Sequence, residues 1–134
     1  MPTRMLREGI LDSERINAVS AMAELHYRKL YSIADDYGRY EAAASLLLVK
    51  LWGFRREITT EMVAGWMDEL EQSVNAEGVP LILVYEVNGK KFLEIQGFGQ
   101  RIRVDKKTGL PVPSRCPDPP SAAIIKLSIN TLIF

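Results

Sequence analysis

Clusters of basic residues are the feature of this sequence that carries the clearest chemistry. They fall in three places, namely Arg55 and Arg56, Lys90 and Lys91, and the run Arg101, Arg103, Lys106 and Lys107. Guanidinium and ammonium groups in such clusters bind phosphate oxygens, and these contacts with nucleic acid are independent of sequence and sensitive to salt. A solvated charged surface is the other interpretation of the same residues. Both interpretations stay open at this point.

Residues suited to catalysis or to metal binding are sparse. The chain has one histidine, His26, and one cysteine, Cys116, far apart in the sequence, so it offers no nucleophile with a nearby base and no zinc-ligand set. The adjacent carboxylates Asp35 and Asp36 would not face each other on a helix. The string GFGQR lacks the Lys-Ser/Thr pair of a phosphate-binding loop. The sequence therefore predicts a non-enzymatic protein with no metal and no cofactor.

A β-hairpin must position the second basic pair. Asn88-Gly89 suits a two-residue type I′ turn, because both central residues of that turn need positive φ. The flanking strings LILVYEV and KKFLEIQ are β-branched, aromatic and aliphatic. Pairing around the turn places Glu86 opposite Lys91 and Tyr85 opposite Phe92, which fixes the expected register.

An amphipathic helix is expected before the hairpin, over residues 59–75. Thr59 or Thr60 can cap its first turn. Its apolar residues recur every three or four positions and form one stripe, comprising Met62, Val63, Trp66, Met67, Leu70 and Val74. Gly78 and Pro80 then prevent the helix from continuing.

Two further helices and a strand are expected upstream. Ser20 is expected to cap a helix over residues 21–37, whose apolar positions are Met22, Leu25, Leu30 and Ile33, with Tyr27 and Tyr31 on its flank. Residues 37–41 favour a short third strand, and residues 42–52 favour a compact apolar helix. Helix, turn, helix and hairpin is the order of a winged helix-turn-helix. The expected fold class is therefore α+β, a winged helix-turn-helix of three main helices plus a β-hairpin wing, with an extended C-terminal tail.

Composition indicates one domain followed by a tail. We expect a winged-helix domain over residues 1–104, a basic and proline-rich linker over 105–120, and an apolar segment over 121–134. The apolar segment is expected to add to a sheet edge, to pack on the domain, or to be buried by a partner, a second copy of the chain included. The chain has no apolar run long enough for a membrane span and no signal peptide, so a cytoplasmic location is expected.

The charge of the chain is uneven, although its net value is zero. Residues 1–78 hold 9 Lys and Arg against 13 Asp and Glu, a net charge of −4, and residues 79–134 hold 8 against 4, a net charge of +4. The helix over residues 59–75 contains no Lys or Arg, which disfavours its entry into a DNA groove. Its acidic residues Asp68, Glu69 and Glu71 suggest instead a surface for a basic protein partner.

Three strings of the sequence resemble a family of phage and prophage proteins. They are PTRMLREGILDSERIN, AELHYRKLYSIADDYGRYEA and VYEVNGKKFLEIQGFGQRIR, and with the residues between them they cover about residues 2–104. The family carries an N-terminal winged-helix module, in some members within replication-initiation (replisome-organiser-like) proteins. Arg39, Arg101 and Arg103 match recurrent family residues. The string AAASLLLVKLWG is more apolar than the family pattern, and SAAIIKLSINTLIF does not match the longer, polar C-terminal region of replication proteins, as in a truncated or specialised member.

The resemblance implies a phage or prophage origin, a winged-helix fold and association with DNA. Two functions are therefore expected as alternatives. The first is a DNA-binding protein that acts in replication initiation or its control through the eight basic residues named above. The second is a protein-interaction module, in which a phage factor docks on a host protein complex through the acidic helix and the apolar tail.

Overall fold

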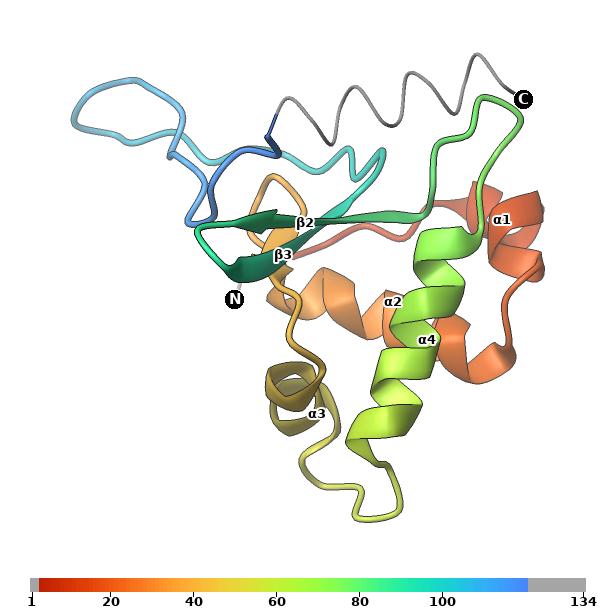
Figure 1. The fold of residues 1–134 in the computed structure, drawn as a ribbon. Coiled ribbons are helices and arrows are strands. Elements are labelled where there is room, and N and C mark those ends of the chain that lie inside the picture. Colours follow the sequence, from red (N-terminus) through yellow and green to blue (C-terminus); the bar gives the residue numbers. More distant parts are fainter. Residues whose placement is uncertain (1–2, 121–134) are drawn as a thin grey trace.

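The computed structural model describes residues 3–120 and is an α+β fold of short helices and one small sheet (Figure 1). The elements are η1 (Glu8–Leu11), α1 (Glu14–Asn17), α2 (Ala21–Ile33), β1 (Arg39–Glu41), α3 (Ala44–Trp52), α4 (Thr60–Gln72), β2 (Ile82–Val87) and β3 (Lys90–Ile95). The apolar segment 121–134, for which addition to a sheet edge, packing on the domain and burial by a partner are the expected alternatives, lies outside the described residues.

The sheet has three antiparallel strands in the order β1-β3-β2. The predicted hairpin register is confirmed, with Tyr85 opposite Phe92 and Glu86 opposite Lys91. The turn residues Asn88 and Gly89 have φ values of 53° and 79°, as a type I′ turn requires. The predicted third strand is also confirmed, since β1 pairs with β3. The order helix, strand, helix, helix, strand, strand is compatible with a winged helix.

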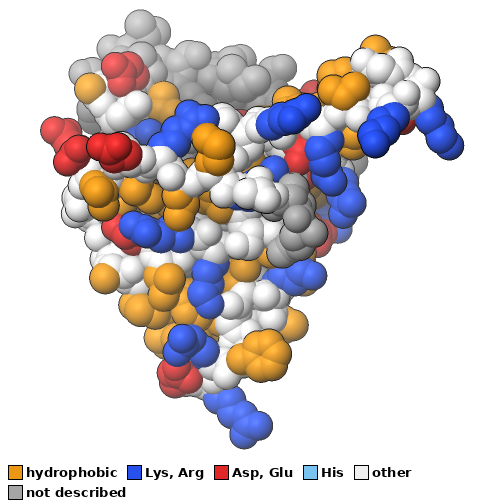
Figure 2. Space-filling model, turned by 180° about the vertical axis from the view of Figure 1, so that it is seen from behind, with side chains coloured by type: hydrophobic (Ala, Val, Ile, Leu, Met, Phe, Trp, Pro, Cys, Tyr) orange, Lys and Arg blue, Asp and Glu red, His pale blue; other side chains and the backbone are white. Residues whose placement is uncertain are grey.

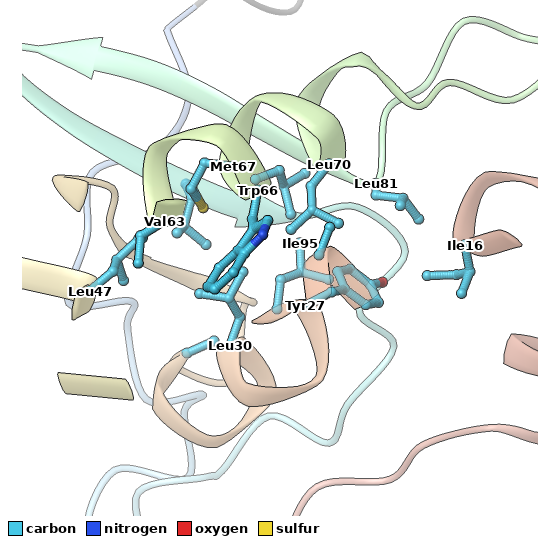
Figure 3. Close-up of a cluster of buried hydrophobic side chains, with 14 of the residues drawn as sticks. Ile16, Tyr27, Leu30, Leu47, Val63, Trp66, Met67, Leu70, Leu81 and Ile95 are labelled. Carbon is cyan, nitrogen blue, oxygen red and sulfur yellow. The ribbon is translucent and has the colours of Figure 1, made fainter. Parts of the chain in front are cut away.

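The core lies between the sheet and the helices, and α4 contributes most of one side of it (Figure 3). Val63, Trp66, Met67 and Leu70 are buried, so the predicted apolar stripe is confirmed over the middle of the helix. The two residues at the ends of that stripe, Met62 and Val74, are exposed. Thr59 caps the helix by accepting a hydrogen bond from the Met62 backbone N–H.

The inward face of α2 differs from the predicted one. Ala23, His26, Tyr27 and Leu30 are buried, whereas the side chains of Met22 and Leu25, predicted to face inward, are exposed. The apolar spacing was right for Leu30, and for Ile33, which packs against the core, but it was wrong for Met22 and Leu25, because His26 and Tyr27 are buried in their place. The cap by Ser20 is confirmed.

The helix α2 also ends earlier than residue 37. Asp35 stops it, because its carboxylate oxygen Oδ1 accepts hydrogen bonds from the backbone N–H groups of Tyr37 and Arg39, at 2.9 and 3.0 Å. An Asp side chain that bonds to nearby backbone groups in this way favours a turn over a helix. Gly38 completes the turn at φ +81°, directly before β1.

The face of the sheet away from the helices is covered by the C-terminal part of the described chain. Leu83, Tyr85 and Phe92 form a second small cluster there, and Cys116 packs against it. The Tyr85 hydroxyl donates a hydrogen bond to the Pro117 carbonyl at 2.7 Å. Residues 112–118, within the segment expected as a linker, therefore lie against the sheet.

Candidate nucleic-acid interface

The first basic pair lies in the connection between α3 and α4. Residues 53–57, which we call the tip, are all exposed, and they run between the buried Trp52 and Ile58. Two successive turns shape the tip, with Arg55 N donating to Trp52 O at 2.9 Å and Ile58 N donating to Arg55 O at 3.2 Å. The guanidinium of Arg55 lies 3.8 Å from the Glu57 carboxylate, and both groups are well exposed. Such a pair contributes little to stability, so Arg55 remains accessible to an anion.

The second basic pair lies at the β2–β3 turn. Lys90 and Lys91 are exposed at the start of β3. The Lys90 ammonium forms an ion pair with Glu41 of β1, and Lys91 stands opposite Glu86 across the hairpin. The charge of the turn is therefore partly compensated within the sheet.

The third basic cluster is carried by a projection that sequence reasoning missed. Residues 101–112, which we call the finger, form a short hairpin-like loop that leaves the sheet (Figure 1). Val112 N donates to Arg103 O at 2.8 Å, and Asp105 N donates to Leu110 O at 2.9 Å. Gly109, at φ +71°, closes the loop. A usable signal was present, because a glycine-containing run between RIRV and LPV is typical of a hairpin with a longer loop.

The finger presents its cations to solvent. All ten residues from 101 to 110 are exposed, and Lys106 and Lys107 lie in its terminal loop. Arg101 is exposed near its base. The finger also contains one acidic residue, Asp105, whose carboxylate accepts a hydrogen bond from the Lys107 backbone N–H at 2.8 Å. An exposed cationic loop of this kind suits contact with a phosphate backbone.

The base of the finger is held by a buried carboxylate. Both the backbone N–H of Arg103 and its Nε donate to Asp36 Oδ2, at 3.0 and 2.9 Å, and Arg4 donates to Asp36 Oδ1 at 3.1 Å. Burial alone would raise the pKa of Asp36, but the hydrogen bonds and charges of Arg103 and Arg4 outweigh it and lower this pKa to about 2. Arg103, which was predicted to contact DNA, therefore holds the base of the finger through its bonds to Asp36.

The three basic groups do not form one compact cluster. In Figure 1 the tip lies at the end of the molecule farthest from the sheet, whereas the β2–β3 turn and the finger lie at the sheet end. Figure 2 shows Lys and Arg side chains distributed over one face, from the projecting finger to the narrow lower end. An extended anionic ligand fits this distribution better than a small one does.

The acidic residues of α4 have different surroundings from one another. Glu69 is half-buried and accepts two hydrogen bonds from the cap of α2, one from Ser20 N at 2.8 Å and one from Ser20 Oγ at 2.9 Å. Asp68 and Glu71 are exposed. The predicted protein-binding group of Asp68, Glu69 and Glu71 thus includes one residue that joins two helices.

The only histidine lies in the core, where it joins three helices. His26 is fully buried, and its Nδ1 accepts a hydrogen bond from the Trp52 indole at 3.0 Å, while its Nε2 lies 3.3 Å from Met67 Sδ. Burial, and secondarily the charge of Lys29, lowers the pKa of His26 to about 4. The imidazole is therefore neutral at neutral pH.

Among residues 3–120, no group of three or more His, Cys, Asp or Glu side chains is arranged to hold a metal ion. No helix in the same part of the chain is long and apolar enough to cross a membrane.

Comparison with known proteins returned no match. The chain matches no protein-family model, no curated protein and no solved structure. The resemblance to phage replication proteins therefore stays a prediction.

Proposed function

We propose that this chain is a non-enzymatic winged-helix protein that binds DNA through its basic segments. The observation that carries the proposal is the finger, where Arg101, Lys106 and Lys107 are exposed on a projection supported by the buried Asp36. Rigid presentation of cations to solvent has no evident use in stabilising the fold, but it favours contact with phosphates. The order of helices and strands is compatible with a winged-helix fold, in which β2 and β3 form the wing.

The mode of binding follows from where the charges lie. The finger, the β2–β3 turn and the tip would each contact the phosphate backbone, which gives affinity with little dependence on sequence. The helix α4 would stay out of the major groove, because Glu61, Asp68 and Glu71 are exposed on it and it carries no Lys or Arg. Binding is thus expected to be dominated by charge rather than by base recognition.

The biological setting is proposed from the sequence resemblance. The strings shared with phage and prophage proteins support an origin in a phage or prophage and a role in replication initiation or its control. Such a protein would act in the bacterial cytoplasm, where the DNA is.

A protein-interaction module is the second candidate, and the acidic surface of α4 favours it. Asp68 and Glu71 are exposed on a helix without basic residues, which suits a basic partner such as a host protein complex. Reversal of charge at Asp68 and Glu71 should abolish capture of that partner and leave the fold intact. Glu69 is unsuitable for this test, because it caps α2 through Ser20.

The DNA-binding proposal is tested with the double variant Lys106→Ala/Lys107→Ala. Fluorescence anisotropy with a labelled mixed-sequence duplex at low salt should show a clear loss of affinity, and the loss should be similar for unrelated duplex sequences. Arg28→Gln serves as the control, since Arg28 lies on α2 and pairs with Glu24 one turn away. Equal affinity of the double variant and the unmodified protein would contradict binding through the finger.

A further inference from the structure

One aromatic side chain, that of Phe54, is fully exposed to solvent. Phe54, at the centre of the tip, has a relative exposure of 105%, although most of the other aromatic side chains contribute to the two hydrophobic clusters. Burial of a Phe side chain stabilises a fold, and this chain forgoes that contribution at Phe54. The exposed position of this ring is therefore not explained by the stability of the fold.

The turn that carries Phe54 is well defined. Phe54 is the third residue of the turn that Arg55 N closes on Trp52 O, at 2.9 Å. Trp52 is in turn buried and donates its indole N–H to His26 at 3.0 Å. Ile58, directly after the tip, is also buried. The turn that carries the phenyl ring is therefore anchored in the core on both sides.

The surroundings of the ring are cationic. Lys50, Arg55 and Arg56 are all exposed and lie within four residues of Phe54 in the chain, and Lys50 belongs to the last turn of α3. Glu57 is the one acidic residue of the tip, and it lies beside Arg55. An aromatic ring among three positive charges matches the two parts of a nucleotide, a flat base and a phosphate.

We propose that Phe54 stacks on an unpaired base, while Lys50, Arg55 and Arg56 contact the adjoining phosphates. The ligand class is DNA that contains single-stranded or unpaired bases, because in a closed duplex both faces of each base are already covered by stacking. The inference rests on the proposed DNA binding and narrows it to a preferred DNA structure. Stacking of one base on an aromatic side chain corresponds to about 5- to 150-fold in affinity, at 1.4 kcal/mol for each factor of ten.

An anionic membrane is the competing ligand for such a tip. Phe54 is accompanied by only one other strongly exposed apolar side chain at this end of α3, Val49 at 72%. Stable membrane attachment by a few cations needs a larger apolar face or a second anchor. The observations therefore favour a nucleic acid.

The experiment compares two labelled DNA molecules of the same sequence, one fully paired and one with a central bubble of unpaired bases. The unmodified protein should bind the bubble more tightly. Phe54→Ala should lower the affinity for the bubble by at least about fivefold and change the affinity for the duplex much less, and Phe54→Trp should retain the preference. Leu11→Ala, which removes another exposed apolar side chain, is the matched control and should change neither affinity.

The outcomes separate this inference from the DNA-binding proposal. Equal affinity of Phe54→Ala and the unmodified protein for the bubble would overturn the stacking inference, while salt-sensitive binding of both DNA molecules would still support DNA binding. Binding of neither DNA would refute both. Phe54-dependent binding to phosphatidylserine-containing vesicles, without an effect on DNA, would overturn the inference in favour of a membrane. Thermal unfolding of each variant verifies that the fold is retained, as the exposure of Phe54 predicts.

Discussion

Protonation of His26 is expected to destabilise the folded chain between about pH 6.5 and pH 4. In the folded state Nδ1 accepts the hydrogen bond of the Trp52 indole at 3.0 Å, and an indole N–H is a donor only. A proton on Nδ1 would therefore remove this bond and place a charge in the core. The ammonium of Lys29, 3.9 Å from the centroid of the Trp52 ring, would add repulsion.

The magnitude follows from the pKa of the imidazole in the two states. An exposed histidine titrates near 6.5, and burial lowers the pKa of His26 to about 4 in the folded chain. The unfolded state thus binds the proton more tightly, so the stability is fully present above pH 6.5 and is lost as the pH falls toward 4. The free energy of unfolding should be about 2 kcal/mol lower at pH 5 than at pH 7.5.

Urea denaturation at pH 7.5 and pH 5 measures this difference directly. The variant His26→Gln is uncharged at both values, so the part of the pH dependence that His26 causes should disappear from it. Because His26 is the only histidine, its imidazole signal in an NMR titration of the unmodified protein is assigned without ambiguity. A pKa near 6.5 in that titration, or an equal pH dependence in His26→Gln, would refute the reasoning.

Three other changes test the contacts that support the finger and the sheet. Asp36→Asn should lower the free energy of unfolding by about 3 kcal/mol in urea denaturation. The reason is that the buried carboxylate, which forms ion pairs with Arg4 and Arg103, would lose its charge. Tyr85→Phe should lower it by about 1 kcal/mol, because the hydrogen bond to Pro117 is lost. The Cys116 thiol, whose pKa is raised by burial, should react with a thiol reagent at pH 8 more slowly in the folded protein than in urea.

Each of these predictions has a result that contradicts it. Unchanged stability of Asp36→Asn would mean that the carboxylate does not hold the base of the finger. Unchanged stability of Tyr85→Phe, with unchanged proteolysis of residues 112–118, would mean that this segment does not cover the sheet. A Cys116 thiol that reacts equally fast in folded and unfolded protein would place it outside the small cluster around Tyr85.

Local features of the sequence were sufficient to predict the hairpin and the middle of α4. The type I′ turn requires positive φ, which Asn88 and Gly89 tolerate, and the turn together with the cross-strand pairs determines the register. The spacing of Val63, Trp66 and Leu70 indicates one helical face. Both signals depend on residues close together in the chain. They are therefore visible without any knowledge of tertiary contacts.

The features that the sequence did not predict depend on distant partners. The inward position of His26 requires Trp52 and Met67 on two other helices. The base of the finger requires Asp36, which is 67 residues from Arg103. Neither pairing has a local signature, so apolar periodicity alone misplaced Met22 and Leu25 on α2, and proline content alone suggested a plain linker after residue 104.

The salt dependence of binding to a mixed-sequence duplex is the measurement that tests DNA binding most directly. Two of the eight basic residues, Lys90 and Arg103, have close ion pairs within the described chain, and the six others are Arg55, Arg56, Lys91, Arg101, Lys106 and Lys107. If each of these six neutralises one phosphate, the logarithm of the association constant should fall with the logarithm of the salt concentration with a slope of about −5.4. The variant Lys106→Ala/Lys107→Ala should then show a slope of about −3.6. Absence of binding at low salt, or the same slope in both proteins, would contradict DNA binding by the finger.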